Sequence, residues 1–206
     1  MDKAARTSPM KYYQELTLLP SCDIPLSFIW SKVYQQLHLG FVEQQDDCGN
    51  VPYGVSFPQY QHDKYKLVLG GKIRVFANSE EELVKLGLKK WLERLMDYVH
   101  ITGIRAVPEK ITGYSIYRRM RQDNCADSKA RRFMMRHKDR NIGYDQTVEM
   151  FSREERHFFD FPYVKQKSLT NNNQFRLYIE KKSCEENRYD GFGTYGLSHE
   201  STVPEF

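Results

Sequence analysis

KIRVFANSEEELVKLGLKKWLERL, residues 72–95, is the stretch of sequence that decides the fold. Its first six residues include β-branched and aromatic side chains, which predicts a strand. Ser79 and Glu82 then make a capping box, and apolar residues at helical spacing predict a helix that continues to Leu95. A strand followed directly by a capped amphipathic helix indicates a domain in which helices pack on a sheet.

The segments on either side extend this pattern. Apolar residues between 26 and 39 recur at three- and four-residue steps, and Gly40 is expected to end that helix. The expected strands are residues 12–19, 53–57, 72–77 and 100–107. The resulting order of strand, helix, strand, strand, helix and strand is that of a ferredoxin-like (βαββαβ) domain. The expected fold class is therefore α+β.

Three parts are expected along the chain. Residues 1–9 form an N-terminal extension, residues 10–108 the ferredoxin-like domain, and residues 109–206 a C-terminal α+β region with an arginine-rich helix. The expected strands of that last region are 114–117, 162–164 and 175–179, and its helix runs from Asp127 or Ser128 to His137.

Positive charge is concentrated in residues 118–140. This window holds nine Lys or Arg and three Asp, a net charge of +6, whereas the whole chain has 31 basic and 27 acidic residues. The rest of the chain therefore sums to −2, and so local a surplus indicates contact with a polyanion. On the expected helix the cations within about 80° of one another are Lys129, Arg132, Arg136 and Arg140.

Such a helix suits the deep groove of an RNA hairpin, contacted through phosphates. A solvated helix with incidental charge is the alternative, and the scarcity of acidic residues at i±4 weighs against it. Phe133 flanks the basic stripe, while Met134 and Met135 are expected to pack inward.

The sequence excludes several common functional motifs. Gly191, Gly193 and Gly196 spell G-x-G-x-x-G, but only ten residues follow, too few for a dinucleotide-binding unit. The three glycines still indicate a backbone that can approach a ligand or phosphate closely. We find no spaced His and Asp series, so no metal site and no cofactor are expected. Of the six histidines, spacing alone does not single out His38.

The expected location is the cytoplasm. No run of 18 apolar residues indicates a membrane span, and the first residues lack the apolar segment of a secretory signal. Four widely separated cysteines without C-x-x-C spacing are typical of reduced thiols.

Four motifs in one order give a more specific indication. They are GVSFP at residues 54–58, RRFMMRH at 131–137, FRLYI at 175–179, and YGLS at 195–198 with Val203-Pro204 near the end. In these motifs the chain, from about Tyr12 to Phe206, resembles the repeat-processing endoribonucleases of subtype I-F CRISPR systems, which cut precursor CRISPR RNA within each repeat.

The resemblance implies a set of catalytic positions. These are His38, Ser168, Thr170 and Tyr195, with Tyr34 as the alternative to His38 one helical turn earlier. His38 is expected to move the proton of the reaction, as general base or general acid. Ser168 and Thr170 are expected to hold the ribose, and Lys165 or Lys167 to stabilise transition-state charge.

The resemblance also implies RNA-binding positions, namely Arg119, Arg121, Lys129, Arg131, Arg132, Arg136, His137, Arg140 and Phe175. Arg119 and Arg121 are expected to read base edges, the others of the basic window to grip groove phosphates, and none of the window to take part in the chemistry. Arg121 stands where the family has Gln, and Met135 where it has Arg, which leaves the repeat sequence open.

The implied function is metal-independent cleavage of the repeat hairpin by its own 2′-hydroxyl. The products would be a 2′,3′-cyclic phosphate and a 5′-hydroxyl, and the protein would stay bound to the CRISPR RNA stem-loop among the other subunits of a surveillance complex. The alternative is a subunit that binds the hairpin without cutting it.

Overall fold

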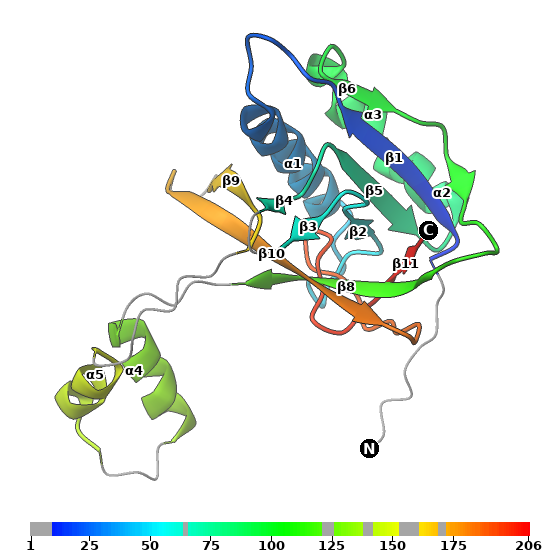
Figure 1. Cartoon of the computed structure of the whole chain (residues 1–206). Helices are drawn as coiled ribbons and strands as arrows, with labels where there is room; N and C mark the ends of the chain where they lie inside the picture. Colours follow the sequence, from blue (N-terminus) through cyan, green and yellow to red (C-terminus); the bar gives the residue numbers. More distant parts are fainter. Residues whose placement is uncertain (1–9, 64–65, 121–125, 138–141, 153–160, 169–171) are drawn as a thin grey trace. The chain divides into compact units, whose positions relative to one another are not determined.

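The computed structural model describes residues 10–63, 66–120, 126–137, 142–152, 161–168 and 172–206 (Figure 1). One segment and three residues named above lie outside the described residues: the extension over 1–9, Arg121, Arg140 and Thr170. The chain forms two compact units. One contains the described residues up to Met120 together with Phe161–Phe206, and the other lies within Arg121–Asp160. The boundaries of these units differ from the expected division at residue 108.

The first sheet of the larger unit has the strand order β2-β5-β1-β6. Its strands are antiparallel: β1 (Tyr12–Leu18), β2 (Gly54–Ser56), β5 (Lys72–Ala77) and β6 (Val99–Ile101), with β7 (Arg105–Ala106) also paired to β1. The connection after β1 is α1 (Leu26–Val42), and the connection after β5 contains α2 (Glu80–Leu86), α3 (Leu88–Trp91) and a 3-10 turn, Glu93–Leu95. Both α1 and α2 pack against β1, so the layers are helices on one sheet, as expected of an α+β fold.

Local chemistry explains where these elements begin and end. The capping box is confirmed, because the Ser79 side chain accepts from the Glu82 N–H and the Glu82 side chain accepts from the Ser79 N–H. The helix it opens breaks at Gly87, whose φ of +61° is left-handed. The expectation that Gly40 ends α1 is wrong. A Cβ on Gly40 would lie 2.9 Å from Nε1 of Trp91, so this glycine lets α3 approach the helix.

A second sheet has the order β11-β8-β10-β9. Its strands are β8 (Gly113–Met120), β9 (Tyr163–Lys167), β10 (Gln174–Cys184) and β11 (Val203–Glu205), all antiparallel. It shares one hydrophobic core with the first sheet: the Tyr117 ring meets the Phe57 ring edge-on at 5.3 Å, and the Tyr60 hydroxyl donates to the Ile179 carbonyl. A short hairpin, β3 (Gln61–His62) with β4 (Leu67–Val68), was not predicted.

The smaller unit is a pair of helices, α4 (Ala126–Arg136) and α5 (Tyr144–Ser152). Ala130 and Thr147 are fully buried, and the Phe133 ring meets the Phe151 ring at 5.8 Å. The expectation that Met135 packs inward is wrong, since its side chain is 74% exposed. None of the described helices is long and apolar enough to cross a membrane.

Candidate active site

Two residues of α1 hold the loop between β10 and β11, which we call the C-terminal loop, against this helix. Tyr34 and His38 are four positions apart and therefore neighbours on one helical face. The Tyr34 hydroxyl donates to the Tyr195 carbonyl at 2.9 Å, and His38 Nδ1 lies 2.9 Å from the Thr194 carbonyl. Consecutive carbonyls are thus bound by side chains one turn apart, which fixes residues 194–195 over the end of the helix.

The glycines of the C-terminal loop make this approach possible. Gly196 has a φ of +67°, and a Cβ there would lie 2.6 Å from a methyl carbon of Val55. Its carbonyl also accepts from the Val55 N–H at 3.0 Å. At Gly196 the close backbone approach is therefore to the core beneath the site, and it presses residues 194–195 onto α1.

His38 has the features of a general base. A carbonyl oxygen can only accept a hydrogen bond, so the contact with Thr194 places the ring proton on Nδ1 and leaves the Nε2 lone pair available. Partial burial lowers the pKa of His38, and the positive charge of Arg119 lowers it further, against the opposing effect of the Thr194 carbonyl. Both lowering effects favour the neutral imidazole, the form that can accept a proton.

Tyr195 covers the imidazole. The His38 and Tyr195 rings are stacked, with centroids 4.1 Å apart and planes 8° from parallel, and the Tyr34 ring lies behind Tyr195 at 6.3 Å. Burial raises the pKa of Tyr195, and Arg119 opposes this increase. Tyr34 is 1% exposed, and burial raises its pKa far above the usual tyrosine value. The geometry therefore favours His38 over Tyr34 as the proton-transfer residue, with Tyr34 as a positioning residue.

Arg119 and Phe175 complete a cluster around Tyr195. The Arg119 guanidinium lies 5.2 Å from the centre of the Phe175 ring and 5.5 Å from that of Tyr195. Arg119 comes from β8 and Phe175 from β10, so Arg119 connects the second sheet to the Tyr195 ring that stacks on His38. Sequence reasoning expected Arg119 only to read base edges and missed its position beside the imidazole. No pattern in the sequence marks that contact, because it depends on the pairing of β8 with β10.

Ser168 follows the last residue of β9, the strand that lies against α1. Gln166 is buried and donates to the Ser31 carbonyl of α1 at 3.2 Å, and it is paired with Phe175 across the sheet. The Ser168 N–H donates to the Asn173 carbonyl at 2.9 Å. In the described part of the chain no hydrogen bond joins Ser168 to His38, so its expected role stays a prediction.

The alternation of β9 separates two sets of residues. Val164 and Gln166 are buried, whereas Tyr163, Lys165 and Lys167 are exposed on the other face. Lys165 and Lys167 thus point away from the side of the sheet that carries Gln166 and Phe175. Among the described residues, the positive charge that lowers the pKa of His38 is that of Arg119, whose guanidinium lies by the Tyr195 ring.

The basic residues of α4 belong to the smaller unit and are described separately. Four of its expected RNA-binding side chains are exposed: Arg131, Arg132, Arg136 and His137. Lys129 is half-buried, with its ammonium 5.8 Å from the centre of the Phe151 ring. Arg131 donates to the Tyr144 hydroxyl of α5 at 3.4 Å, and the His137 ring lies 4.6 Å from Phe133. α5 therefore supports the basic helix from one side.

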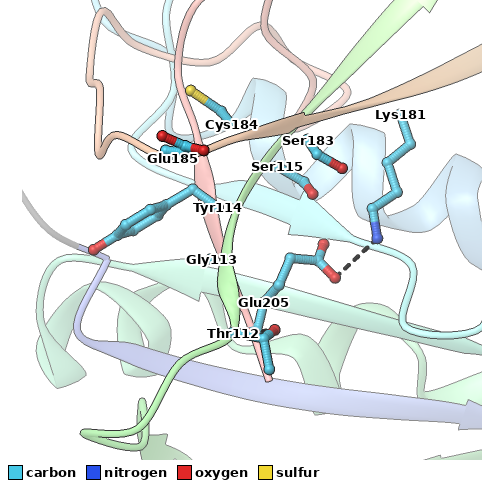
Figure 2. A pocket seen from close by; sticks show the side chains of 9 residues that line it. All are labelled: Thr112, Gly113, Tyr114, Ser115, Lys181, Ser183, Cys184, Glu185 and Glu205. Atoms are coloured by element: carbon cyan, nitrogen blue, oxygen red, sulfur yellow. Dashed lines mark hydrogen bonds and ion pairs between the residues drawn. The ribbon is translucent and has the colours of Figure 1, made fainter.

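A pocket of about 440 Å³ lies elsewhere on the larger unit (Figure 2). Lys181 and Glu205 form an ion pair of 2.9 Å in its wall, beside Ser115 and Ser183. Lys181 is six residues from Phe175 along β10, which corresponds to about 20 Å. This pocket is therefore separate from the His38 cluster. Among the described residues, no group of three or more His, Cys, Asp or Glu side chains is placed to hold a metal ion.

Comparison with known proteins places the chain in a family. A family model described as CRISPR-associated protein (Cas_Csy4) matches residues 13–206. The relatives include the CRISPR-associated endonuclease Cas6/Csy4 of Pseudomonas aeruginosa (strain UCBPP-PA14), 28% identical over 198 residues, and that of Escherichia coli (strain UTI89 / UPEC), 26% identical over 200 residues. Each alignment covers 96% of this chain and 100% of the relative.

A similar solved structure, described as an RAMP protein binding different RNA substrates, covers 93% of this chain and 99% of its own, with 11% identity and a TM-score of 0.37. So low a score carries no argument about function. The family match, in contrast, spans both sheets and the His38 cluster, and it confirms the resemblance inferred from the motifs. The chain belongs to the Cas_Csy4 family of CRISPR-associated proteins.

Proposed function

We propose that this protein is a metal-independent endoribonuclease that cuts a CRISPR repeat hairpin and stays bound to the product. The observation that carries the proposal is the state of His38: a ring with its proton held on Nδ1 by Thr194, a lowered pKa, and Nε2 available for proton transfer. The names of the relatives, CRISPR-associated endonucleases, support the class of reaction.

In the proposed reaction, RNA supplies its own nucleophile. His38 Nε2 takes the proton of the 2′-hydroxyl next to the scissile phosphate, the 2′-oxygen bonds to phosphorus, and the bond to the 5′-oxygen breaks. The leaving oxygen takes a proton from solvent or from the imidazolium, giving a 2′,3′-cyclic phosphate and a 5′-hydroxyl. General base catalysis of this kind contributes about 10²–10⁴-fold.

The residues around His38 receive roles from their positions. Arg119 is the cation beside the cluster, so we assign it the stabilisation of charge on the phosphorane oxygens, a role the sequence had suggested for Lys165 or Lys167. Ser168, and Thr170 outside the described residues, would orient the ribose. Tyr195 would keep the imidazole plane fixed through the stack at 4.1 Å.

The remaining expectations complete the proposal. The strand order β2-β5-β1-β6, with helices after β1 and β5, supports a ferredoxin-like assignment for the first sheet. Exposed Arg132 and Arg136 on α4 support phosphate contacts in the groove of the hairpin. Retention of the cut hairpin within a larger CRISPR RNA complex completes the proposed role.

A cleavage assay tests the proposal. The cognate repeat hairpin is incubated with the protein in EDTA, alongside a copy carrying a 2′-deoxy nucleotide at the cut. We expect cleavage of the all-ribose RNA only, with products carrying a cyclic phosphate. Tight binding of both RNAs without any cleavage would instead identify a hairpin-binding subunit.

A variant isolates the role of His38. His38→Asn keeps an amide donor near the position of Nδ1, so the bond to Thr194 can persist while proton transfer is lost. We expect cleavage to fall by at least about 100-fold with little change in hairpin affinity. The matched control is His100→Asn, at an exposed histidine of β6, which should cut like the unmodified protein.

A further inference from the structure

One face of the second sheet is not used by the proposed reaction. We call it the outer face: the side of β8, β9 and β10 that carries Arg118, Tyr163, Lys165, Lys167, Arg176, Tyr178 and Lys182. The register places Lys165 opposite Arg176 and Tyr163 opposite Tyr178, so these four side chains share that face. Gln166 and Phe175 lie on the inner face, toward α1 and the His38 cluster.

The outer face is positively charged. On the described strands β8, β9 and β10 it carries five cations and one anion, Glu180. Glu180 is paired with Arg118, so it does not neutralise the cations of β9. Lys165 and Lys167 are exposed and separated by two residues, about 7 Å along the strand. A row of exposed cations of this kind complements a polyanion that follows the strand.

Aromatic rings lie between these cations. The Arg176 guanidinium lies over the Tyr163 ring at 4.8 Å and donates to the Tyr178 hydroxyl at 3.3 Å, and the two tyrosine rings are 5.3 Å apart. The Tyr163 side chain is 39% exposed. Cations interleaved with an accessible aromatic ring and an oriented guanidinium are the combination that binds single-stranded nucleic acid, through phosphates and base stacking.

The outer face is also continuous with the candidate active site along the chain. β9 ends at Lys167, and the next residue is Ser168. On the other side of the same strand Gln166 contacts α1, which carries His38. A strand of RNA leaving the cluster past the end of β9 would therefore meet Lys167, then Lys165, then Tyr163.

We propose that the outer face binds single-stranded RNA flanking the hairpin, with phosphates at Lys165, Lys167 and Arg176 and a base stacked at Tyr163. The inference rests on the proposed function, because it needs RNA at the His38 cluster. It assigns separate tasks to the two faces of the sheet. Cleavage takes place at the His38 cluster, on the side of the inner face, and the outer face binds the single-stranded RNA that extends from this cluster.

The test compares three RNAs by fluorescence anisotropy: the bare hairpin, the hairpin with a 5′ single-stranded extension, and the hairpin with a 3′ extension. A triple variant, Lys165→Gln, Lys167→Gln and Arg176→Gln, removes the cations. The matched control is Lys85→Gln, Lys89→Gln and Lys90→Gln, which removes the same charge from exposed positions of α2 and α3.

We expect one extension to tighten binding about tenfold in the unmodified protein. The triple variant should lose this gain and keep its affinity for the bare hairpin. Since a single-stranded RNA contact contributes about 0.7 to the salt slope per phosphate, the slope for that RNA should become less steep by about 2. The control variant should retain the gain. Tyr163→Ala should lose several-fold of it, and Tyr163→Phe should not.

Three outcomes would overturn the inference. They are equal binding of all three RNAs by the unmodified protein, an extension gain that survives in the triple variant, and a loss that the control variant reproduces. If the tighter binding of the extended RNA survived in the triple variant, an acidic protein surface would be the remaining candidate partner of the outer face. Failure of the proposed function is a different result: the unmodified protein would not cut the bare hairpin, whatever the extensions do to binding.

Discussion

Tyr34→Phe separates positioning from proton transfer at the candidate site. The substitution removes one oxygen and keeps the ring that lies 6.3 Å from Tyr195 and 6.2 Å from Phe57. The lost bond is the 2.9 Å contact to the Tyr195 carbonyl, made by a side chain that is 1% exposed. Loss of this hydrogen bond leaves the Tyr195 carbonyl without its donor, which costs about 2 kcal/mol in the free energy of unfolding. For a chain of this size we therefore expect the melting temperature to fall by about 4–8 °C.

The activity of the same variant decides between the two residues of α1. In single-turnover cleavage with the protein in excess, Tyr34→Phe should slow the reaction by less than about tenfold, because His38 keeps its bond to Thr194. His38→Asn should lose at least about 100-fold. If a folded Tyr34→Phe protein lost as much as His38→Asn, proton transfer would belong to Tyr34 and the assignment to His38 would be refuted.

Three further predictions concern the same cluster. Burial lowers the pKa of His38 below its ordinary value of 6.5, so the single-turnover rate should rise with pH and reach half of its plateau value below pH 6.5. A rate that falls steadily between pH 5 and 8 would show that the protonated ring is the active form. Because the folded state favours the neutral ring, the contribution of His38 to stability should be present above pH 6.5 and lost as the pH falls through the lowered value, and His38→Asn should remove this dependence. Gly196→Ala forces a Cβ to within 2.6 Å of Val55 at a left-handed φ, which should cost about 1–3 kcal/mol in thermal unfolding and slow cleavage by shifting residues 194–195. The control is Gly103→Ala, where nothing lies within 4 Å of the added carbon; equal effects at both positions would contradict the packing argument.

The secondary structure of the larger unit was largely accessible from sequence because its signals are local. The capping box at Ser79 and the β-branched and aromatic side chains of residues 72–77 report directly on neighbours in the chain. The prediction that Gly40 ends α1 was wrong because the role of this glycine depends on a residue distant in sequence. A glycine that ends a helix and a glycine that admits Trp91 look identical in one sequence.

The candidate site was accessible only in part, for the same reason. Position His38 came from the family resemblance, and its bond to Thr194 spans 156 residues, which no periodicity reports. Arg119 appeared as one cation of a basic window, and only the pairing of β8 with β10 brings it to Phe175 and Tyr195. The four-residue spacing of Tyr34 and His38 is consistent with one helical face, but spacing alone did not single out His38.

The G-x-G-x-x-G segment contributes to the candidate site through its backbone. Its second half, Gly193 to Gly196, closes a turn through the Gly196 N–H and the Gly193 carbonyl at 2.7 Å. That turn carries the two carbonyls that bind Tyr34 and His38. A side chain at Gly196 would shift the neighbouring Thr194 carbonyl, which fixes the tautomer of His38. The proton on Nδ1 of a helical histidine is thereby set by the packing of a loop some 156 residues away.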